Sequence, residues 1–206
     1  MLKRTKGYLL LTLLVLTGLA GNTHSSSISG KERKALTNQL KDSKATFLKS
    51  VKGLSEAQLN FKPAPDKWSV KECIYHIALA EGNLWGIADA QLKQAANPEK
   101  RSEIKVTDDA FVKMVSDRTN KVKTTEPFEP HNAPWKTADE AIEAFKTKRA
   151  DLVKYVKTST EDLRNHVVQM PFGYVDSYQV MLMIAAHTLR HTKQIEEVKA
   201  DANFPK

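Results

Sequence analysis

Apolar residues recur every three or four positions along four long segments of the chain, the spacing that places them on one face of an α-helix. The first segment covers residues 31–51, the second runs from Ser69 to about Gln94, and the fourth covers residues 177–200. The third begins at Thr137 and carries the apolar stripe Ile142, Phe145, Leu152 and Val156. Charged residues fill the opposite faces, so each segment is predicted to be an amphipathic helix.

Capping signals mark the start of the last three helices. Ser69, Thr137 and Asp176 are each followed three positions later by Glu or Gln, which is the spacing of a helix capping box. We find no internal repeat, and the one β-leaning pair, Val167-Val168, is too short to carry a sheet. The sequence therefore predicts an all-α fold, a four-helix bundle in residues 31–200.

The segment between the second and third helices, residues 95–136, has a different composition. It is charged, opens with Asn97-Pro98 and closes with three prolines, and a short helix is expected within residues 107–120. A connection of this length is usually a crossover or a functional lid. We therefore expect a long crossover between helices 2 and 3.

The N-terminus has the pattern of an export signal. Three basic residues come first, and a mostly apolar run over residues 8–20 follows, too short for a spanning helix. Gly18 and Ala20 suit a cleavage site, so residues 1–20 are predicted to be a signal peptide and residues 21–30 a flexible lead-in. The cleaved protein is expected to be periplasmic or extracellular, without a stable membrane span. An uncleaved anchor is the alternative.

Charge and cysteine content narrow the range of partners. The net charge of +8 suggests nucleic acid, but the signal segment removes three positive charges and leaves +5 on an exported chain. An exported protein seldom meets nucleic acid, so we expect a small-molecule substrate or ligand instead. The single cysteine, Cys73, excludes a disulfide framework and a multi-cysteine metal site. The oligomeric state stays open, a homodimer included.

Three histidines are predicted to face the interior of the bundle. His187 and His191 lie one turn apart on the apolar stripe of the last helix, and His76 is flanked at helical spacing by Cys73 and Ala80. This arrangement lets three imidazoles from two helices converge on one metal ion and leave a coordination position open, as catalytic sites do. The alternative is that each imidazole is simply hydrogen-bonded in the core.

Other polar residues near these histidines are candidates for supporting roles. Glu81 lies on the inward stripe of the second helix, where it could accept a proton or ligate, and Gln194 and Arg190 lie near the histidine pair. Trp68 is expected to pack at the entrance of the second helix. The remaining histidines fall in predicted loops and are expected to be solvated, namely His24, His131 and His166.

Three pieces of the sequence form a recognisable set, namely the segment Asp66-Lys67-Trp68-Ser69-Val70, the segment Ile74-Tyr75-His76-Ile77 with Glu81, and the segment from Ala186 to Ile195 that contains His-x3-His. In this order they resemble the DinB-like family, also called the YfiT-like metalloenzymes. The resemblance covers most of residues 31–200. It implies a four-helix bundle with a long connection between the second and third helices.

The resemblance also implies a metal site and leaves the reaction open. Three histidines of this family bind nickel or zinc inside the bundle, which here makes His76, His187 and His191 the ligands. Related branches use low-molecular-weight thiols for isomerisation or transfer, and others are described as metal-dependent hydrolases. Since thiol cofactors are scarcer outside the cytoplasm, our leading hypothesis is an exported metal-dependent hydrolase with Glu81 as general base. A thiol-dependent transferase, a non-catalytic metal or small-ligand binding protein, and a structural bundle without metal are the alternatives.

Overall fold

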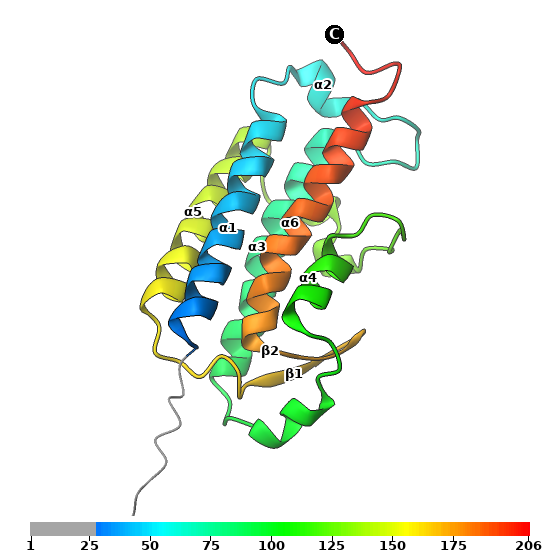
Figure 1. Cartoon of the computed structure of the whole chain (residues 1–206). Helices are drawn as coiled ribbons and strands as arrows, with labels where there is room; N and C mark the ends of the chain where they lie inside the picture. Colours follow the sequence, from blue (N-terminus) through cyan, green and yellow to red (C-terminus); the bar gives the residue numbers. More distant parts are fainter. Residues whose placement is uncertain (1–27) are drawn as a thin grey trace, which may run out of the picture.

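Four long helices form the bundle that the sequence predicts (Figure 1). The computed structural model describes residues 28–206. The bundle consists of α1 (Gly30–Val51), α3 (Val70–Leu92), α5 (Ala138–Thr158) and α6 (Ser177–Lys199). Both α5 and α6 pack against α1 and α3, so the four helices enclose one continuous interior. The short helix α2 (Glu56–Asn60) lies in the connection between α1 and α3.

The folded part of the chain begins slightly earlier than predicted. α1 starts at Gly30, and Ser29 caps it through a full capping box with Glu32. Residues 28–30, which end the predicted lead-in of residues 21–30, therefore belong to the fold. The predicted signal peptide, residues 1–20, lies outside the described residues.

The predicted capping residues do start the later bundle helices. Ser69 forms a complete capping box with Glu72. The side chains of Thr137 and Asp176 also accept the expected backbone N–H groups, but the side chains three residues further on turn to other partners. These two caps are therefore half of the reciprocal arrangement that the spacing predicts.

The connection between α3 and α5 is the long crossover expected over residues 95–136. It contains four short elements, namely η1 (Pro98–Glu103), α4 (Asp108–Ser116), η2 (Glu126–Phe128) and η3 (Pro130–Asn132). The predicted helix within residues 107–120 is present as the shorter α4. α4 packs on the outer side of α6, whereas η2 and η3 pack against α3. The crossover therefore contacts both helices that carry the candidate histidines.

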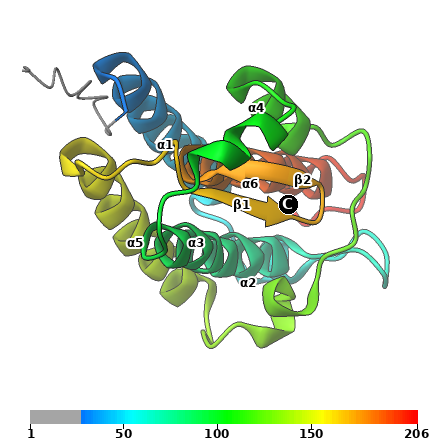
Figure 2. The same cartoon turned by 90° about the horizontal axis from the view of Figure 1, so that it is seen from below.

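A β-hairpin lies across one end of the bundle, so the prediction that the chain has no strand pair is wrong (Figure 2). β1 (Val167–Met170) and β2 (Gly173–Asp176) pair in antiparallel register. The strand sequences VVQM and GYVD do not alternate apolar and polar residues, so they carry no period-2 pattern that would predict them. Gly173 supplies the positive φ of 129° after the turn. The Asn97 side chain both donates to and accepts from the backbone of Val167, which stabilises the edge of β1.

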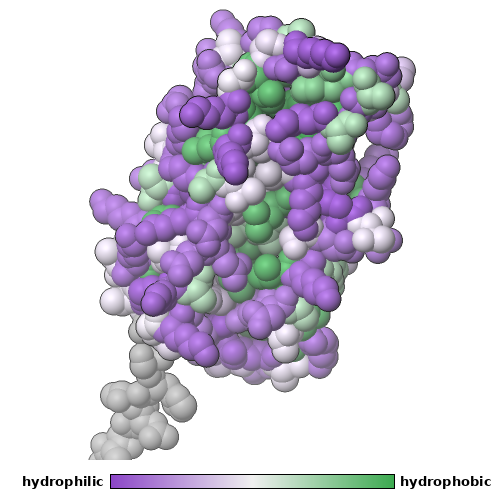
Figure 3. Space-filling model, turned by 45° about the horizontal axis from the view of Figure 1, so that its top comes forward, coloured by the Kyte–Doolittle hydropathy of each residue, from purple (hydrophilic) through white to green (hydrophobic). Residues whose placement is uncertain are grey.

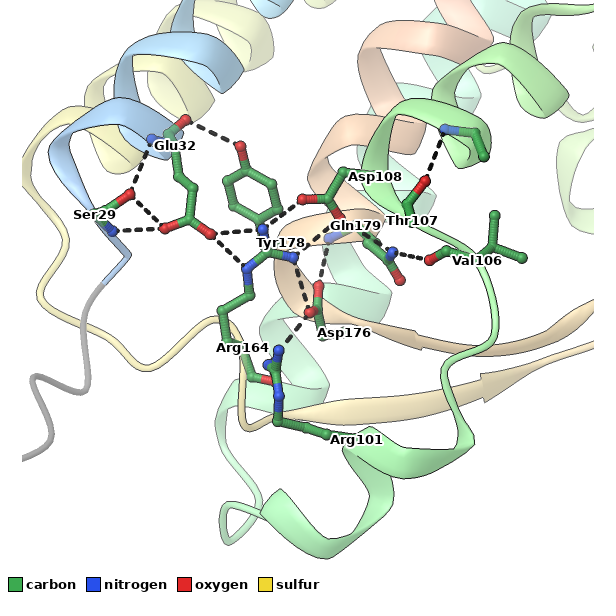
Figure 4. A network of polar contacts seen from close by, with 11 residues as sticks. Ser29, Glu32, Arg101, Val106, Thr107, Asp108, Arg164, Asp176, Tyr178 and Gln179 are labelled. Atoms are coloured by element: carbon green, nitrogen blue, oxygen red, sulfur yellow. Dashed lines mark hydrogen bonds and ion pairs between the residues drawn. The ribbon is translucent and has the colours of Figure 1, made fainter.

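A network around Arg164 joins the hairpin end to the starts of three helices (Figure 4). The guanidinium donates to Glu32 at the start of α1 and to Asp108 at the start of α4. It also donates to Asp176, the cap of α6, over 3.0 Å, and it stacks on the Tyr178 ring at 3.9 Å. One arginine thus fixes the crossover and the hairpin against the bundle.

A polar layer divides the apolar core into two clusters. The cluster nearer the hairpin contains Leu40 and Leu84, and the cluster nearer α2 contains Phe47 and Phe145, whose rings pack edge to face. Between the two clusters, all four bundle helices contribute buried polar side chains, which are Ser43, His76, Glu81, Arg149, Thr188 and His191. A polar layer this deep in a core must have its hydrogen-bonding groups satisfied, and this requirement decides which of its members are available to a ligand.

The surface is mostly hydrophilic on the face shown in Figure 3, with apolar residues in separate patches. Few large apolar side chains are exposed among the described residues, namely Val106, Met114, Val122 and Phe172. No helix in residues 28–206 combines the length and the apolar character that a membrane crossing requires.

Candidate metal centre

The three histidines predicted as ligands meet inside the bundle. The Nε2 atom of His76 on α3 lies 3.2 Å from Nε2 of His187 and 3.0 Å from Nε2 of His191, both on α6. One ligand atom from each residue lies within 4.8 Å of the others. His76 and His191 are buried, and His187 is half-buried. The helical spacing in the sequence therefore does bring the three imidazoles together.

The hydrogen bonds on the other ring nitrogens show what these Nε2 atoms can do. The Nδ1 atom of His76 lies 2.6 Å from the carbonyl oxygen of Phe128, and Nδ1 of His191 lies 2.9 Å from Oε1 of Gln194. Both oxygens only accept, so both histidines carry their proton on Nδ1 and present an Nε2 lone pair. Two lone pairs thus face each other at 3.0 Å. A cation between them satisfies both, so the donor set fits a metal ion.

The surroundings also keep the three rings neutral. Burial lowers the pKa of His76 to about 4. Burial, reinforced by the neighbouring imidazoles, lowers the pKa values of His187 and His191 well below their ordinary value. Neutral imidazole is the form that ligates metal ions, so the cluster needs no deprotonation at neutral pH.

Trp68 covers one side of the cluster, a position that its sequence context did not predict. It directly precedes the cap of α3, where packing at the helix entrance was expected, but its ring lies over the histidines. The ring centroids are 4.8 Å from His76 and 6.0 Å from His191. Trp68 also lines a cavity of about 260 Å³ between the segment before α3 and η3. The indole therefore contacts both the imidazoles and this cavity.

Glu81 does not join the histidines. Both of its carboxylate oxygens accept hydrogen bonds from Arg149, over 2.5 and 2.6 Å, and both side chains are buried. Arg149 also donates to Ser43, Thr188 and the carbonyl oxygen of Leu40, so all of its N–H donors have acceptors. The expected role of Glu81 as a general base does not fit this pairing, because Arg149 engages both carboxylate oxygens.

Arg149 is the buried partner that the sequence analysis missed. It lies on the apolar stripe of α5, four residues after Phe145 and three before Leu152. An arginine at this position of an apolar stripe is rarely buried without an acid facing it. That rule, applied to the inward position of Glu81, could have predicted the pair.

Of the other polar candidates near the histidines, one contacts the cluster and the others have structural roles. Gln194 orients His191, as its predicted place near the histidine pair suggested. Arg190 instead donates to the carbonyl oxygen of Asn120 over 2.7 Å and so fixes the crossover. Cys73 is buried, and burial raises the pKa of its thiol, as expected for an unreactive cysteine.

The three remaining histidines have different surroundings. His166 was expected to be solvated, but it is buried, and its Nδ1 lies 3.1 Å from the carbonyl oxygen of Gln91. The prediction is wrong because the unpredicted hairpin and the end of α3 enclose this ring. His131 is exposed in η3, as predicted. His24 lies outside the described residues.

Comparisons with known proteins agree with this architecture. The family model of the DinB superfamily matches residues 39–195, which include all three clustered histidines. The uncharacterized protein YuaE of Bacillus subtilis strain 168 is 28% identical over 156 residues, which cover 72% of this chain and 88% of that protein. The structure of YfiT from Bacillus subtilis matches with a TM-score of 0.59 at 14% identity, covering 87% of this chain and 92% of that chain. YfiT is described as a probable metal-dependent hydrolase with an unusual four-helix bundle topology.

Proposed function

This chain belongs to the DinB superfamily, and on that basis we propose that it binds one divalent metal ion through the Nε2 atoms of His76, His187 and His191. The observation that carries the proposal is the pair of Nε2 lone pairs facing each other at 3.0 Å in the polar layer. Nitrogen ligands of this kind suit nickel and zinc, and these are the two ions that we propose.

We further propose that the centre serves hydrolysis of a small-molecule substrate. An ion with three protein ligands keeps a coordination position open and supplies Lewis-acid chemistry to a substrate oxygen and to water. The chain's own residues prepare the site. Phe128 and Gln194 fix the imidazole orientations, and Trp68 excludes solvent on one side. His187 keeps partial contact with solvent, so we place substrate access on its side. The description of YfiT as a probable metal-dependent hydrolase supports this reaction class.

A second candidate function is binding of a metal ion or small ligand without turnover. The observation in its favour is the absence of a carboxylate from the histidine group among residues 28–206, with Glu81 engaged by Arg149. A hydrolase of this design needs another route for the proton that leaves the attacking water. Assays of the metal-loaded protein on ester, amide and phosphoester substrates separate the two candidates.

Metal analysis of single-histidine variants tests the proposal. The purified protein, offered zinc or nickel, should carry about one equivalent, and replacing any one of the three histidines by alanine should remove most of it, because two imidazoles leave an exchangeable site. His131→Ala is the matched control, since His131 is exposed and outside the cluster. Three variants that retain metal at the wild-type level would show that the ligand assignment is wrong.

We also propose that the protein acts outside the cytoplasm. Support comes from the basic start of the chain, its short apolar run and the small residues Gly18 and Ala20. N-terminal sequencing of the protein from its native cells tests this proposal. The mature chain should start near Gly21, and an intact Met1 on cytoplasmic protein would contradict it.

A further inference from the structure

The crossover reaches the candidate metal centre through two consecutive carbonyl groups. The carbonyl oxygen of Phe128 accepts the hydrogen bond from Nδ1 of His76. The carbonyl oxygen of Pro127, directly before it, accepts a hydrogen bond of 2.8 Å from Nδ2 of Asn83. His76 and Asn83 lie seven residues apart on α3, which places them on the same face of the helix, two turns apart. α3 therefore binds this part of the crossover at two points.

The segment of the crossover that carries these carbonyls is internally braced. Nδ2 of Asn132 donates to the carbonyl oxygen of Glu126 over 2.6 Å, and the backbone N–H of Asn132 donates to the carbonyl oxygen of Glu129. Proline at positions 127 and 130 fixes the backbone φ angle in each 3-10 turn. A segment built in this way moves as a unit, so a bond that holds Pro127 also holds the carbonyl group of Phe128.

The position of the Phe128 carbonyl group decides what His76 can do. Its hydrogen bond keeps the imidazole proton on Nδ1 and leaves the lone pair on Nε2, where the other two histidines lie. If the carbonyl group moved away, the proton could reside on Nε2 instead, and that tautomer cannot ligate through Nε2, the atom that faces the other two histidines. Partners of this type typically change metal affinity about 10- to 100-fold when they are removed.

We propose that Asn83 is a positioning residue for the metal centre. By donating to the carbonyl oxygen of Pro127, it holds the next carbonyl group on Nδ1 of His76 and so selects the ligating tautomer. Asn83 is half-buried, and its side chain hydrogen-bonds to Pro127 rather than to the histidines, so its effect passes through the crossover. The inference rests on the metal centre proposed above, although the tautomer of His76 is defined without a metal ion.

The test compares two variants that each remove one side-chain bond to the crossover backbone. Asn83→Asp keeps the shape of the side chain but replaces the donor by a carboxylate, which repels the Pro127 carbonyl group. Lys193→Met is the matched control, because Nζ of Lys193 donates to the carbonyl oxygen of Ser116, at the end of α4 and away from Phe128. Asn83→Ala removes the donor without adding repulsion. Both Asn83 and Lys193 are accessible to solvent, so the variants should fold.

Two measurements are made on each variant. Long-range ¹H–¹⁵N spectra of the metal-free protein report the tautomer of His76 and the exchange of its Nδ1 proton. Competition with a chelator reports the affinity for zinc. Asn83→Asp should increase the Nε2-protonated tautomer, speed exchange of the Nδ1 proton and weaken zinc binding about 3- to 10-fold, less than loss of a direct partner would. Asn83→Ala should give a smaller change in the same direction, and Lys193→Met should change neither quantity.

The outcomes separate this inference from the proposed function. If the wild type binds zinc and Asn83→Asp matches it in affinity and tautomer, the role of Asn83 is wrong and the metal centre stands. If Lys193→Met has the same effect as Asn83→Asp, the crossover is loosened in general and the specific role is again wrong. If the wild type binds neither zinc nor nickel, the proposed function fails, and the His76 spectra alone decide the role of Asn83.

Discussion

Two groups of polar side chains share the layer that divides the core, and they differ in how completely they are satisfied. The Arg149–Glu81 pair carries opposite charges, and all of the guanidinium donors have acceptors within the bundle. The three histidines are neutral rings from α3 and α6 whose Nε2 atoms face one another. The first group is closed to any ligand, and the second has unused lone pairs at its centre.

This difference shows that burial of a polar residue does not by itself mark a functional site. Glu81 and His76 occupy similar positions on one helix, and both looked like site residues in the sequence. Glu81 proves to be half of a satisfied ion pair, whereas the Nε2 lone pair of His76 faces the other two imidazoles of the cluster. The functional candidate is the group whose hydrogen-bonding capacity the protein leaves open.

The largest expected effect comes from breaking the closed group. Arg149→Met leaves Glu81 buried without its counter-charge and should lower the free energy of unfolding by about 3–5 kcal/mol. Denaturant unfolding measures this loss. The double variant Arg149→Met with Glu81→Leu should lose less than Arg149→Met alone, because no uncompensated charge remains. A single variant within about 1 kcal/mol of the wild type would show that the pair is not the buried, satisfied group described here.

A smaller effect is expected in the open group. His187→Phe removes a ring that makes no hydrogen bond outside the cluster among the described residues, so the metal-free variant should stay within about 1 kcal/mol of the wild type. The two proteins should differ once zinc is added. Zinc at about 100 times its Kd should raise the free energy of unfolding of the wild type by roughly 2.7 kcal/mol and leave that of the variant unchanged. Thermal unfolding with and without zinc gives both numbers. Equal stabilisation of both proteins would place the ion elsewhere.

The smallest effect belongs to a third polar group, the solvent-accessible network around Arg164. Burial alone would raise the pKa of Glu32, but hydrogen bonds from Ser29 and Arg164 lower it from 4.5 to about 2. Because the pKa is lower in the folded state, this stabilisation is present above pH 4.5 and is lost as the pH falls towards 2. Glu32→Gln should therefore lose less stability than the wild type across that window in acid unfolding curves.

An exposed carboxylate serves as the control for the acid experiment. Glu103→Gln changes a solvent-exposed side chain at the end of η1 and should leave the acid profile of the wild type unchanged. A Glu32→Gln profile identical to that of the wild type would show that the Arg164 network contributes no pH dependence through Glu32.

The sequence was sufficient to predict the bundle and the histidine cluster because both follow from helical periodicity. His187 and His191 are related by one turn of a single helix, and His76 lies on the apolar stripe of another. Once both stripes must face one core, the three rings are confined to the same interior. Local spacing and the need to bury apolar surface therefore determined these features.

The features that could not be predicted depend on contacts between distant segments. The Phe128 carbonyl group reaches His76 only because the crossover folds back over α3. The pattern of side chains in a sequence does not indicate where a backbone carbonyl group will lie. The hairpin was missed for a related reason, since its edge is completed by Asn97 from the start of the crossover. Trp68 directly precedes a helix cap, which suggested a local packing role. No pattern in the sequence indicates that its ring packs on the histidines instead.

Anomalous diffraction at the zinc or nickel absorption edge, from crystals of the protein grown with that ion, tests the metal centre most directly. The account predicts one strong anomalous peak at roughly 2.0–2.1 Å from the Nε2 atoms of His76, His187 and His191. It also predicts that the peak disappears in His187→Phe crystals grown in the same way. Well-ordered crystals with no peak at the cluster, or with the metal bound elsewhere, would contradict it and leave the three histidines as residues of the core.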